Sequence, residues 1–188
     1  MILKRNFYKQ DTLNVAKRLL GCFLVRKIGN KIIKGMITET EAYIGEDDLA
    51  CHASKGRTPR TEVMYGEAGR AYIYMIYGMH HCLNIVTEKK NFPAAVLIRG
   101  LANISEWKTN RREWIKTSDV SNLNGPGKLC KFFKTDRKLN DADITKKDKL
   151  WVESGLKIKN SNIKKSKRVG IDYARHCRYY LWRFHLNN

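Results

Sequence analysis

TETEAYIG at residues 38–45 and RAYIYMIYGMHHCLNIV at residues 70–86 are the two stretches of sequence that decide the fold of this chain. Side chains two residues apart in a β-strand point to the same face, so the first stretch places Glu39, Glu41 and Tyr43 together. In the second stretch, apolar and aromatic residues flank a turn at Tyr77-Gly78. We therefore expect a β-hairpin with strands at 71–76 and 82–87.

Hydrophobic periodicity predicts further elements on either side of these stretches. A second hairpin, with strands at 22–28 and 31–43, turns at Gly29-Asn30, which is a two-residue hairpin signal. A helix over 11–20 has one apolar face and ends at Gly21. The remaining expected elements are strands at 95–99, 150–153, 168–171 and 178–184, a helix beginning at Ser105 and including Trp107, Arg111, Trp114 and Ile115, and a helix over 125–134 with Pro126 in its first turn.

Length and composition indicate one folded domain. The chain has 188 residues, of which 43% are hydrophobic, so it can bury a sizeable core and is not a disordered chain. Hairpins interspersed with short helices are typical of the α+β class. We expect a single domain over residues 1–188, with a curved, mostly antiparallel sheet and helices packed around it.

The chain is strongly basic. It has 37 Lys and Arg residues against 18 Asp and Glu, which gives a formal net charge of +19. Such an excess favours a phosphate backbone, an acidic membrane surface or an acidic protein as partner. A compositional bias of the genome toward Lys and Asn also produces basic proteins, so charge alone does not choose between these readings.

The cysteines and histidines predict neither disulfides nor a metal site. The five cysteines are odd in number and never occur as C-x-x-C, and the first residues (MILKRNFYKQ) do not resemble a secretory signal. His80, His81 and Cys82 are adjacent in a predicted strand and therefore point to alternating faces. We expect a protein of the reducing cytoplasm that has no transmembrane span, metal or other cofactor.

Glu41 is the candidate for acid–base chemistry. A carboxylate on a strand is most often one partner of a surface ion pair. Here the chain has few acids and many bases, and cationic surroundings keep a carboxylate ionised, as a general base requires. Arg99 stands at the end of an apolar strand, so it is a candidate to help orient a water molecule held by Glu41.

The tyrosines of the second stretch divide into two groups. Tyr72 and Tyr74 share one face of a strand, where core packing is the ordinary explanation. Tyr77 stands at the hairpin turn and would project from the sheet. A projecting ring can enter and unstack a base step, whereas a turn tyrosine can equally fold back onto the protein surface.

Three basic residues are candidates for contacts to a phosphate backbone. Arg57 and Arg60 belong to the basic loop HASKGRTPR, although many loop arginines are only solvated. Lys128 follows Gly125-Pro126-Gly127, where a helix start can present amide groups to a phosphate. A plain helix start is the commoner use of such a segment. The basic segment at 157–168 is either a solvated face or a further contact region.

Taken together, these motifs resemble the alkyladenine (3-methyladenine) DNA glycosylase family in its compact bacterial form. The resemblance spans nearly the whole chain, and the order of its motifs makes it specific. The segments that carry it are NFYKQDTLNVAKRLLGCFLVR, TEAYIGEDDLACHA, GRTPR, YIYMIYGMHHCLN, AVLIRGL, GPGKLCK and RVGIDYA.

The resemblance implies a role for each matching residue. Glu41 matches the general base that activates water to attack C1′ of the damaged nucleotide, and Arg99 matches the arginine that helps to hold this water. Tyr77 matches the ring that fills the vacated base stack. The residues that match the pocket for the flipped base are Tyr43, His52 and Tyr74, which stack on it, and Asn84, which excludes guanine.

The resemblance also implies a monofunctional base excision repair enzyme that leaves an abasic site in double-stranded DNA. Its expected substrates are damaged purines, namely 3-methyladenine and possible further lesions such as 7-methylguanine, hypoxanthine and ethenoadenine. We expect a monomer that is associated with the bacterial nucleoid and has no membrane contact and no obligate protein partner. The alternative from another class is a non-catalytic nucleic-acid-binding protein that uses its charge and tyrosines as a stacking platform. A zinc nucleobase deaminase is not supported, because the sequence lacks its H-x-E and P-C-x-x-C motifs.

Overall fold

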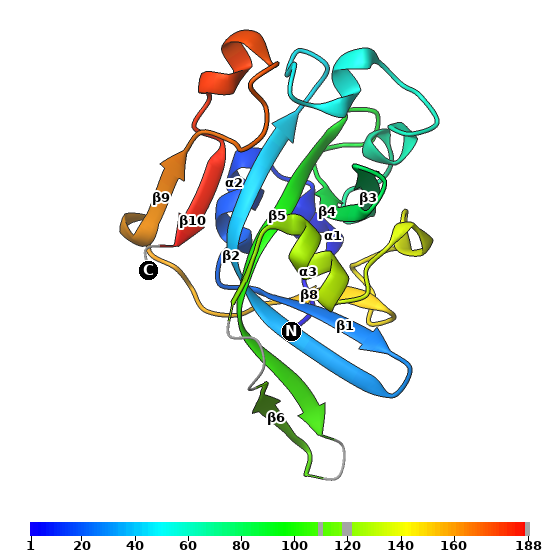
Figure 1. Cartoon of the computed structure of the whole chain (residues 1–188), viewed down its shortest axis with the longest axis vertical. Helices are drawn as coiled ribbons and strands as arrows, with labels where there is room; N and C mark the ends of the chain where they lie inside the picture. Colours follow the sequence, from blue (N-terminus) through cyan, green and yellow to red (C-terminus); the bar gives the residue numbers. More distant parts are fainter. Residues whose placement is uncertain (109–110, 118–121, 187–188) are drawn as a thin grey trace.

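The fold is one large antiparallel sheet with short helices packed against it, as a computed structural model shows (Figure 1). The structure describes residues 1–108, 111–117 and 122–186. Every strand pairing among these residues is antiparallel. The strands are β1 (Phe23–Ile28), β2 (Lys31–Ile44), β3 (Ala71–Ile76), β4 (His80–Val86), β5 (Ala94–Lys108), β6 (Glu113–Lys116), β7 (Asn122–Asn124), β8 (Leu150–Glu153), β9 (Ile163–Ser166) and β10 (Arg183–Leu186).

Two long strands, β2 and β5, form the centre of the sheet. The main order is β3-β4-β5-β2-β1-β8, and β10 pairs with β2 beyond the part of that strand that pairs with β1. The register between β2 and β5 shifts at three places, between Lys34 and Thr40 on β2. Such bulges bend strands and increase their twist. The predicted α+β class with a curved, mostly antiparallel sheet is confirmed.

The helices are α1 (Arg5–Tyr8), α2 (Thr12–Leu19) and α3 (Pro126–Phe132). Asp11 caps α2 by accepting a hydrogen bond from the backbone amide of Asn14 at 2.8 Å, and the buried face of α2 packs on β2 and β5. Pro126 occupies the first turn of α3, as expected, and α3 packs on β4 and β5. None of the helices in the described ranges is long and apolar enough to cross a membrane.

Both predicted hairpins are confirmed, but the helix expected from Ser105 is wrong. β5 runs on to Lys108 and pairs with β6, so the region forms a β-ribbon that extends away from the rest of the sheet (Figure 1). Trp107 lies opposite Trp114, with ring centroids 5.5 Å apart, and the Lys34 ammonium group lies 4.0 Å from the centroid of Trp114. Cross-strand aromatic pairing therefore outweighs the helical spacing of these residues.

The tail of the chain also differs from expectation. The strand predicted at 150–153 forms β8, but the one predicted at 168–171 is absent, because Arg168 is buried in an ion pair and Gly170 has a φ of 73°. Only the end of the strand predicted at 178–184 is extended, as β10, and a 3₁₀ helix occupies Arg175–Tyr179. The basic segment at 157–168 contains β9, which pairs with β10 at the edge of the sheet.

Candidate active site

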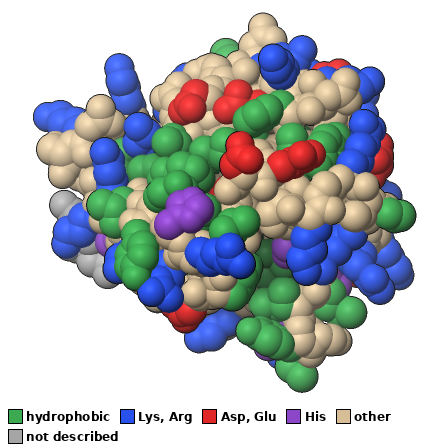
Figure 2. Space-filling model, turned by 90° about the horizontal axis from the view of Figure 1, so that it is seen from above, with side chains coloured by type: hydrophobic (Ala, Val, Ile, Leu, Met, Phe, Trp, Pro, Cys, Tyr) green, Lys and Arg blue, Asp and Glu red, His purple; other side chains and the backbone are tan. Residues whose placement is uncertain are grey.

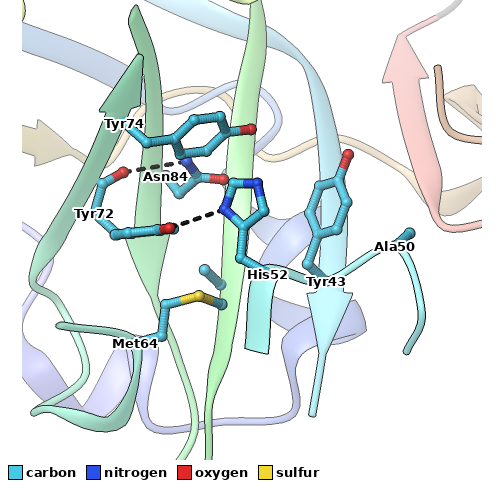
Figure 3. Close-up of a pocket in the computed structure, with 8 residues that line it drawn as sticks. Tyr43, Ala50, His52, Met64, Tyr72, Tyr74 and Asn84 are labelled. Carbon is cyan, nitrogen blue, oxygen red and sulfur yellow. Dashed lines mark hydrogen bonds between the residues drawn. The ribbon is translucent and has the colours of Figure 1, made fainter. Parts of the chain in front are cut away.

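A pocket opens where the ends of four strands meet a short 3₁₀ helix (Figure 3). Its enclosed space is small, about 20 Å³, and it opens to solvent. β2 contributes Tyr43, and the 3₁₀ helix His52–Lys55 contributes His52. The remaining lining residues are Ala50, Met64, Tyr72, Tyr74, Asn84 and Ala95. All four predicted base-pocket residues, Tyr43, His52, Tyr74 and Asn84, thus line one pocket.

The register of the sheet explains why residues distant in the sequence meet here. Glu41 lies opposite Leu97, Leu97 lies opposite Asn84, and Asn84 lies opposite Tyr72. Directly opposed residues of antiparallel strands point to the same face, so this row of four strands carries one continuous surface. Tyr43 and Tyr74 are each two residues from a member of the row and share its face.

Glu41 is fully buried, and both of its carboxylate oxygens are engaged. The Tyr43 hydroxyl donates a hydrogen bond to Oε2 at 2.8 Å, and the Val169 backbone amide donates one to Oε1 at 2.8 Å. The Arg99 Nε atom lies 3.4 Å from Oε1. Glu41 is therefore held in a single orientation at the edge of the pocket that Tyr43 lines.

Arg99 and Glu41 are brought together as predicted, and Glu39 joins them. The Arg99 Nε atom donates to the Glu39 carboxylate at 3.0 Å, which is shorter than its distance to Glu41. Glu39 also lies 3.6 Å from the Nε atom of Arg183 on β10. Arg99 is thus shared between two carboxylates that stand two residues apart on one face of β2.

Burial dominates the electrostatics of Glu41. It raises the pKa of this carboxyl group above its usual range, although Arg99, the Val169 amide and the Tyr43 hydroxyl each act to lower it. The sequence argument considered only the cationic surroundings, which it expected to keep the group ionised. The full burial of Glu41 reverses the direction of that expected shift.

His52 is held as a neutral ring. Burial, followed by the nearby Arg60 and Lys55, lowers the pKa of His52 to about 4. Its Nδ1 atom lies 2.8 Å from the Tyr72 hydroxyl, and its Nε2 atom lies 3.4 Å from an Arg60 nitrogen. Arginine can only donate, so Nε2 accepts and we assign the ring proton to Nδ1, which donates to Tyr72. His52 therefore presents an uncharged ring to the pocket.

The pKa shifts of Glu41 and His52 predict how the rate of the expected base excision changes with pH on the acid side (the acid limb) of its profile. If ionised Glu41 is required, the reaction rate should rise with pH through one ionisation above 4.5, the usual value for this group, since burial raises its pKa. His52, with a pKa of about 4, is already neutral in that range. Single-turnover rates between pH 4 and 9 should show this limb in the parent and in His52→Asn. Loss of the limb in His52→Asn would assign it to the histidine instead.

Tyr77 projects from the tip of the hairpin formed by β3 and β4. It is 86% exposed, and its backbone is in the left-handed region with a φ of 51°. Gly78 follows with a φ of 67°, so both central residues of the turn have positive φ, as type I′ turns require. The ring does not fold back onto the surface, which was the alternative that the sequence left open.

The three candidate phosphate-contact residues have different surroundings. Arg57 forms a bidentate ion pair with Glu62, at 2.8 and 2.6 Å. Arg60 lies against the pocket, with its guanidinium 5.4 Å from the centroid of Tyr74. Lys128 is exposed in the first turn of α3. Among these, Arg57 already has a carboxylate partner within its own loop.

Two features of the site were missed by the sequence argument. Val169 acts through its backbone amide, which leaves no signature in side-chain chemistry, although it belongs to the RVGIDYA segment. Asp48 and Arg168 form a buried ion pair behind Tyr43, and no sequence pattern indicates that these residues, 120 positions apart, would meet. No group of three or more His, Cys, Asp or Glu side chains within the described ranges is arranged to hold a metal ion.

An ionisable, buried carboxylate beside a pocket walled by aromatic rings suits hydrolysis next to a flat, aromatic group. The chain matches the family model of methylpurine-DNA glycosylases over residues 6–188. Similar proteins come from Clostridium perfringens strain SM101, with 44% identity over 100% of this chain and 97% of the relative, and from Methanocella arvoryzae, with 46% identity over 100% and 93%. Both are named, provisionally, as 3-methyladenine DNA glycosylases. This chain belongs to the methylpurine-DNA glycosylase family.

Proposed function

We propose that this protein is a monofunctional DNA glycosylase of base excision repair that removes 3-methyladenine from duplex DNA. Further candidate substrates are 7-methylguanine, hypoxanthine and ethenoadenine. The observation that carries the proposal is the position of Glu41, which is joined through the Tyr43 hydroxyl to a pocket with aromatic walls. The family and the names of its relatives support the same reaction, hydrolysis of the N-glycosidic bond.

Base flipping is the first step of the proposed mechanism. A base inside a duplex cannot reach a pocket of this kind, so the nucleotide must rotate out of the stack. Tyr77 is placed to enter the vacated position, since it is exposed at the tip of a hairpin. In the pocket, the rings of Tyr43, His52 and Tyr74 would stack on the flipped purine. A methylated, cationic purine stacks favourably on such electron-rich rings.

Asn84 would supply discrimination within the pocket. Its side chain is buried, and its Nδ2 atom donates to the Tyr72 carbonyl oxygen at 3.1 Å. That bond fixes the amide against the pocket wall, where a guanine 2-amino group would collide with it. The proposed role is therefore steric discrimination against purines that carry a 2-amino group, so that 7-methylguanine should be a poorer substrate than 3-methyladenine.

Glu41 would act as the general base for the hydrolytic step. Its carboxylate accepts a proton from water as the water oxygen bonds to C1′, while the bond from C1′ to the purine nitrogen breaks and its electron pair leaves with the base. The negative charge also stabilises the oxocarbenium character of the sugar. Arg99, which lies 3.4 Å from the carboxylate, would help to orient the water. This scheme uses only groups of the chain and a water molecule.

Duplex DNA containing a damaged purine is the proposed partner, and the protein would act on it as a monomer without another protein. Figure 2 looks onto the end of the molecule that is uppermost in Figure 1, and it shows Lys and Arg side chains around much of its outline. These basic side chains suit contact with the phosphates of DNA.

A comparison of affinities tests the proposal against binding by charge alone. Duplex DNA with a single abasic-site analogue should bind at least about tenfold more tightly than the same duplex without it, because only the first accommodates Tyr77 and a flipped nucleotide. Fluorescence anisotropy in 150 mM salt, with both duplexes in competition, measures the ratio. Equal affinities would favour a non-catalytic binder over a glycosylase.

The basic loop offers a matched pair of variants for the phosphate contacts. Arg60→Ala should lower the slope of log K against log salt concentration by about 1, since each phosphate contact releases about one counterion. Arg57→Ala should leave the slope nearly unchanged, because Glu62 already neutralises this guanidinium. Binding to an abasic-site duplex between 50 and 300 mM salt gives both slopes. Equal slopes for the two variants would remove Arg60 from the DNA contacts.

A further inference from the structure

Asp48 and Arg168 form a fully buried ion pair that takes no part in the mechanism described above. Asp48 lies just after β2, and Arg168 follows β9. Two parallel contacts join them, Nη1 to Oδ2 at 2.5 Å and Nη2 to Oδ1 at 2.7 Å, with side-chain exposures of 0% and 1%. A buried pair of this kind contributes little net stability, because removing both charges from water offsets their attraction. Its presence is therefore not explained by stability alone.

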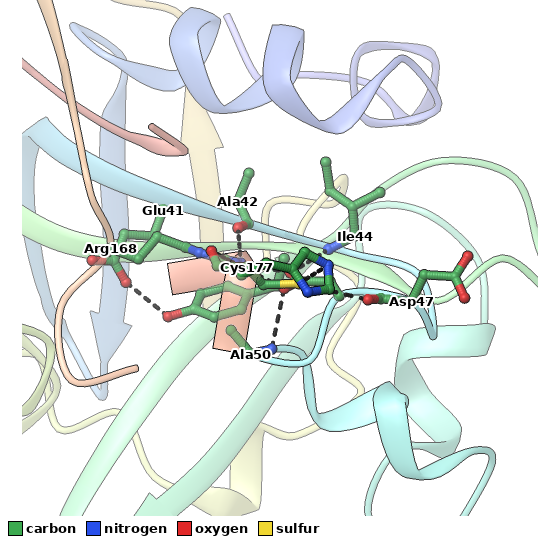
Figure 4. Close-up of polar contacts among 10 residues, drawn as sticks. Glu41, Ala42, Ile44, Asp47, Ala50, Arg168 and Cys177 are labelled. Atoms are coloured by element: carbon green, nitrogen blue, oxygen red, sulfur yellow. Dashed lines mark hydrogen bonds and ion pairs between the residues drawn. The ribbon is translucent and has the colours of Figure 1, made fainter. Parts of the chain in front are cut away.

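Each partner is also hydrogen-bonded to the backbone near the pocket, and Figure 4 shows Arg168 with its surroundings. Arg168 donates to the carbonyl oxygens of Ala42 at 2.8 Å and Cys177 at 3.3 Å. Asp48 accepts from the backbone amides of Ile44 at 3.2 Å and Ala50 at 3.1 Å. The pair thus joins the end of β2 and the turn after it to the tail of the chain.

The guanidinium of Arg168 supports Tyr43 directly. It lies 4.8 Å from the centroid of the Tyr43 ring and 5.0 Å from that of Trp182. Tyr43 lines the pocket but Arg168 does not, so Arg168 covers the face of the ring that points away from the pocket. Contact between a guanidinium and an aromatic face is favourable and restricts the position of the ring.

Arg168 also fixes the position of Val169, whose backbone amide contacts Glu41. Val169 follows Arg168 directly in the chain, and its amide donates to Glu41 Oε1 at 2.8 Å. The Tyr43 hydroxyl donates to Oε2, also at 2.8 Å. Both oxygens of Glu41 are therefore held by groups whose own positions depend on Arg168.

From these contacts we infer that Asp48 and Arg168 are positioning residues, which hold the Tyr43 ring and the Glu41 carboxylate in the geometry that base excision requires. The inference rests on the proposed glycosylase function. It assigns to the ion pair an effect on the reaction rate that is separate from any effect on folding. A small displacement of a reacting group is enough to lower a rate about 100-fold.

The test is a double variant that removes both charges and keeps the volume. In Asp48→Asn/Arg168→Met, the asparagine oxygen still accepts from one of the two amides, Ile44 or Ala50, that Asp48 engages with different oxygens, and the methionine fills the space of the arginine stem. Thermal melting should remain cooperative, since no buried charge is left without a partner. Single-turnover release of 3-methyladenine from methylated duplex DNA should fall about 30- to 100-fold. Affinity for an abasic-site duplex should stay within about threefold of the parent, because the DNA contacts are intact.

Matched controls separate positioning from stability. Arg5 and Asp143 form an ion pair at 2.8 Å whose side chains are 28% and 13% exposed, and they also hydrogen-bond to Ala68 and Thr145, neither of which lines the pocket. Arg5→Met/Asp143→Asn should keep the parental excision rate even if its melting temperature falls. Arg168→Lys, which retains the charge but not the bidentate geometry, should fold and also lose excision rate.

Three outcomes would overturn the inference. In the first, the double variant Asp48→Asn/Arg168→Met folds and excises the base at the parental rate. In the second, its excision rate falls only in proportion to its loss of DNA affinity. In the third, Arg5→Met/Asp143→Asn loses as much excision rate as the double variant. If the parent protein itself releases no base, the proposed function fails first, and the measurement distinguishes that case. A variant that does not fold is replaced by Arg168→Lys, to which the same criteria apply.

Discussion

Glu41→Gln should lower the rate of base excision by about 10³-fold, within the range that general bases contribute, and should leave lesion binding intact. Glutamine has the shape of glutamate and can still accept from the Val169 amide, which donates to Oε1 in the parent. It cannot take a proton from water. Tyr77 and the rings of the pocket are unchanged, so affinity for an abasic-site duplex should stay within about threefold. Single-turnover base release and anisotropy titrations measure the two quantities separately.

Glu39→Gln is the matched control for this variant. Glu39 lies on the same face of β2 and accepts from Arg99 at 3.0 Å, but it is Glu41 that accepts from the Tyr43 hydroxyl and is thereby joined to the pocket. Its replacement should lower the rate by less than about tenfold, through Arg99 alone. Normal turnover by Glu41→Gln, or equal losses in the two variants, would contradict the role assigned to Glu41.

Glu41→Gln should also be at least as stable as the parent protein at neutral pH. Burial raises the pKa of Glu41 in the folded state above that of the unfolded chain, so ionisation of this group opposes folding above the raised pKa. That penalty disappears as the pH falls and the carboxyl group becomes protonated. Glutamine carries no such penalty. The melting temperature of Glu41→Gln should therefore equal or exceed that of the parent at pH 7, and the difference should shrink toward pH 4.

Tyr77→Asn should stabilise the fold and impair the reaction on duplex DNA. Tyr77 has a φ of 51°, a conformation that costs most residues about 1–2 kcal/mol, whereas Asn-Gly is the preferred sequence for this turn. The free energy of unfolding should rise by about 1 kcal/mol. Without the ring, flipping loses a contribution of about 2 kcal/mol, so excision from duplex DNA should fall about 30-fold. Urea titrations and single-turnover assays provide the two values.

Two comparisons make this prediction specific. Tyr77→Phe keeps both the ring and the strained backbone, so it should match the parent in stability and in rate. The loss in Tyr77→Asn should be smaller when the lesion stands opposite a mismatched base, because a poorly paired base is easier to unstack. An undiminished rate in Tyr77→Asn on fully paired DNA would remove Tyr77 from the flipping step.

Local sequence signals were sufficient to predict most strands of the sheet. Gly29-Asn30 and Tyr77-Gly78 both satisfy the backbone requirements of tight turns, and both hairpins form where they were expected. The region after Ser105 was misassigned because its tryptophans also fit a helical spacing. What decides its structure is the cross-strand contact of Trp107 with Trp114, which are seven residues apart, a spacing that fits one face of a helix as well as a hairpin.

The part of the site that lies within one strand could be predicted from the sequence, but its contacts with distant residues could not. Alternation along one strand brought Glu41 and Tyr43 together, and this needs no knowledge of distant segments. One hydrogen bond to Glu41 comes from Val169, 128 residues further along the chain, and the contact on the Tyr43 ring comes from Arg168. Because both contacts come from the irregular segment that follows β9, neither periodicity nor turn chemistry could have indicated them.

The most direct measurement of the central claim is the joint count of released bases and abasic sites when the purified protein acts on methylated duplex DNA. Free 3-methyladenine is quantified by chromatography, and abasic sites by strand cleavage in alkali. The account predicts one abasic site for every base released above spontaneous depurination, in strands that stay intact until alkali is added. Release no faster than without protein, or strand breaks that form together with the free base, would contradict a monofunctional glycosylase.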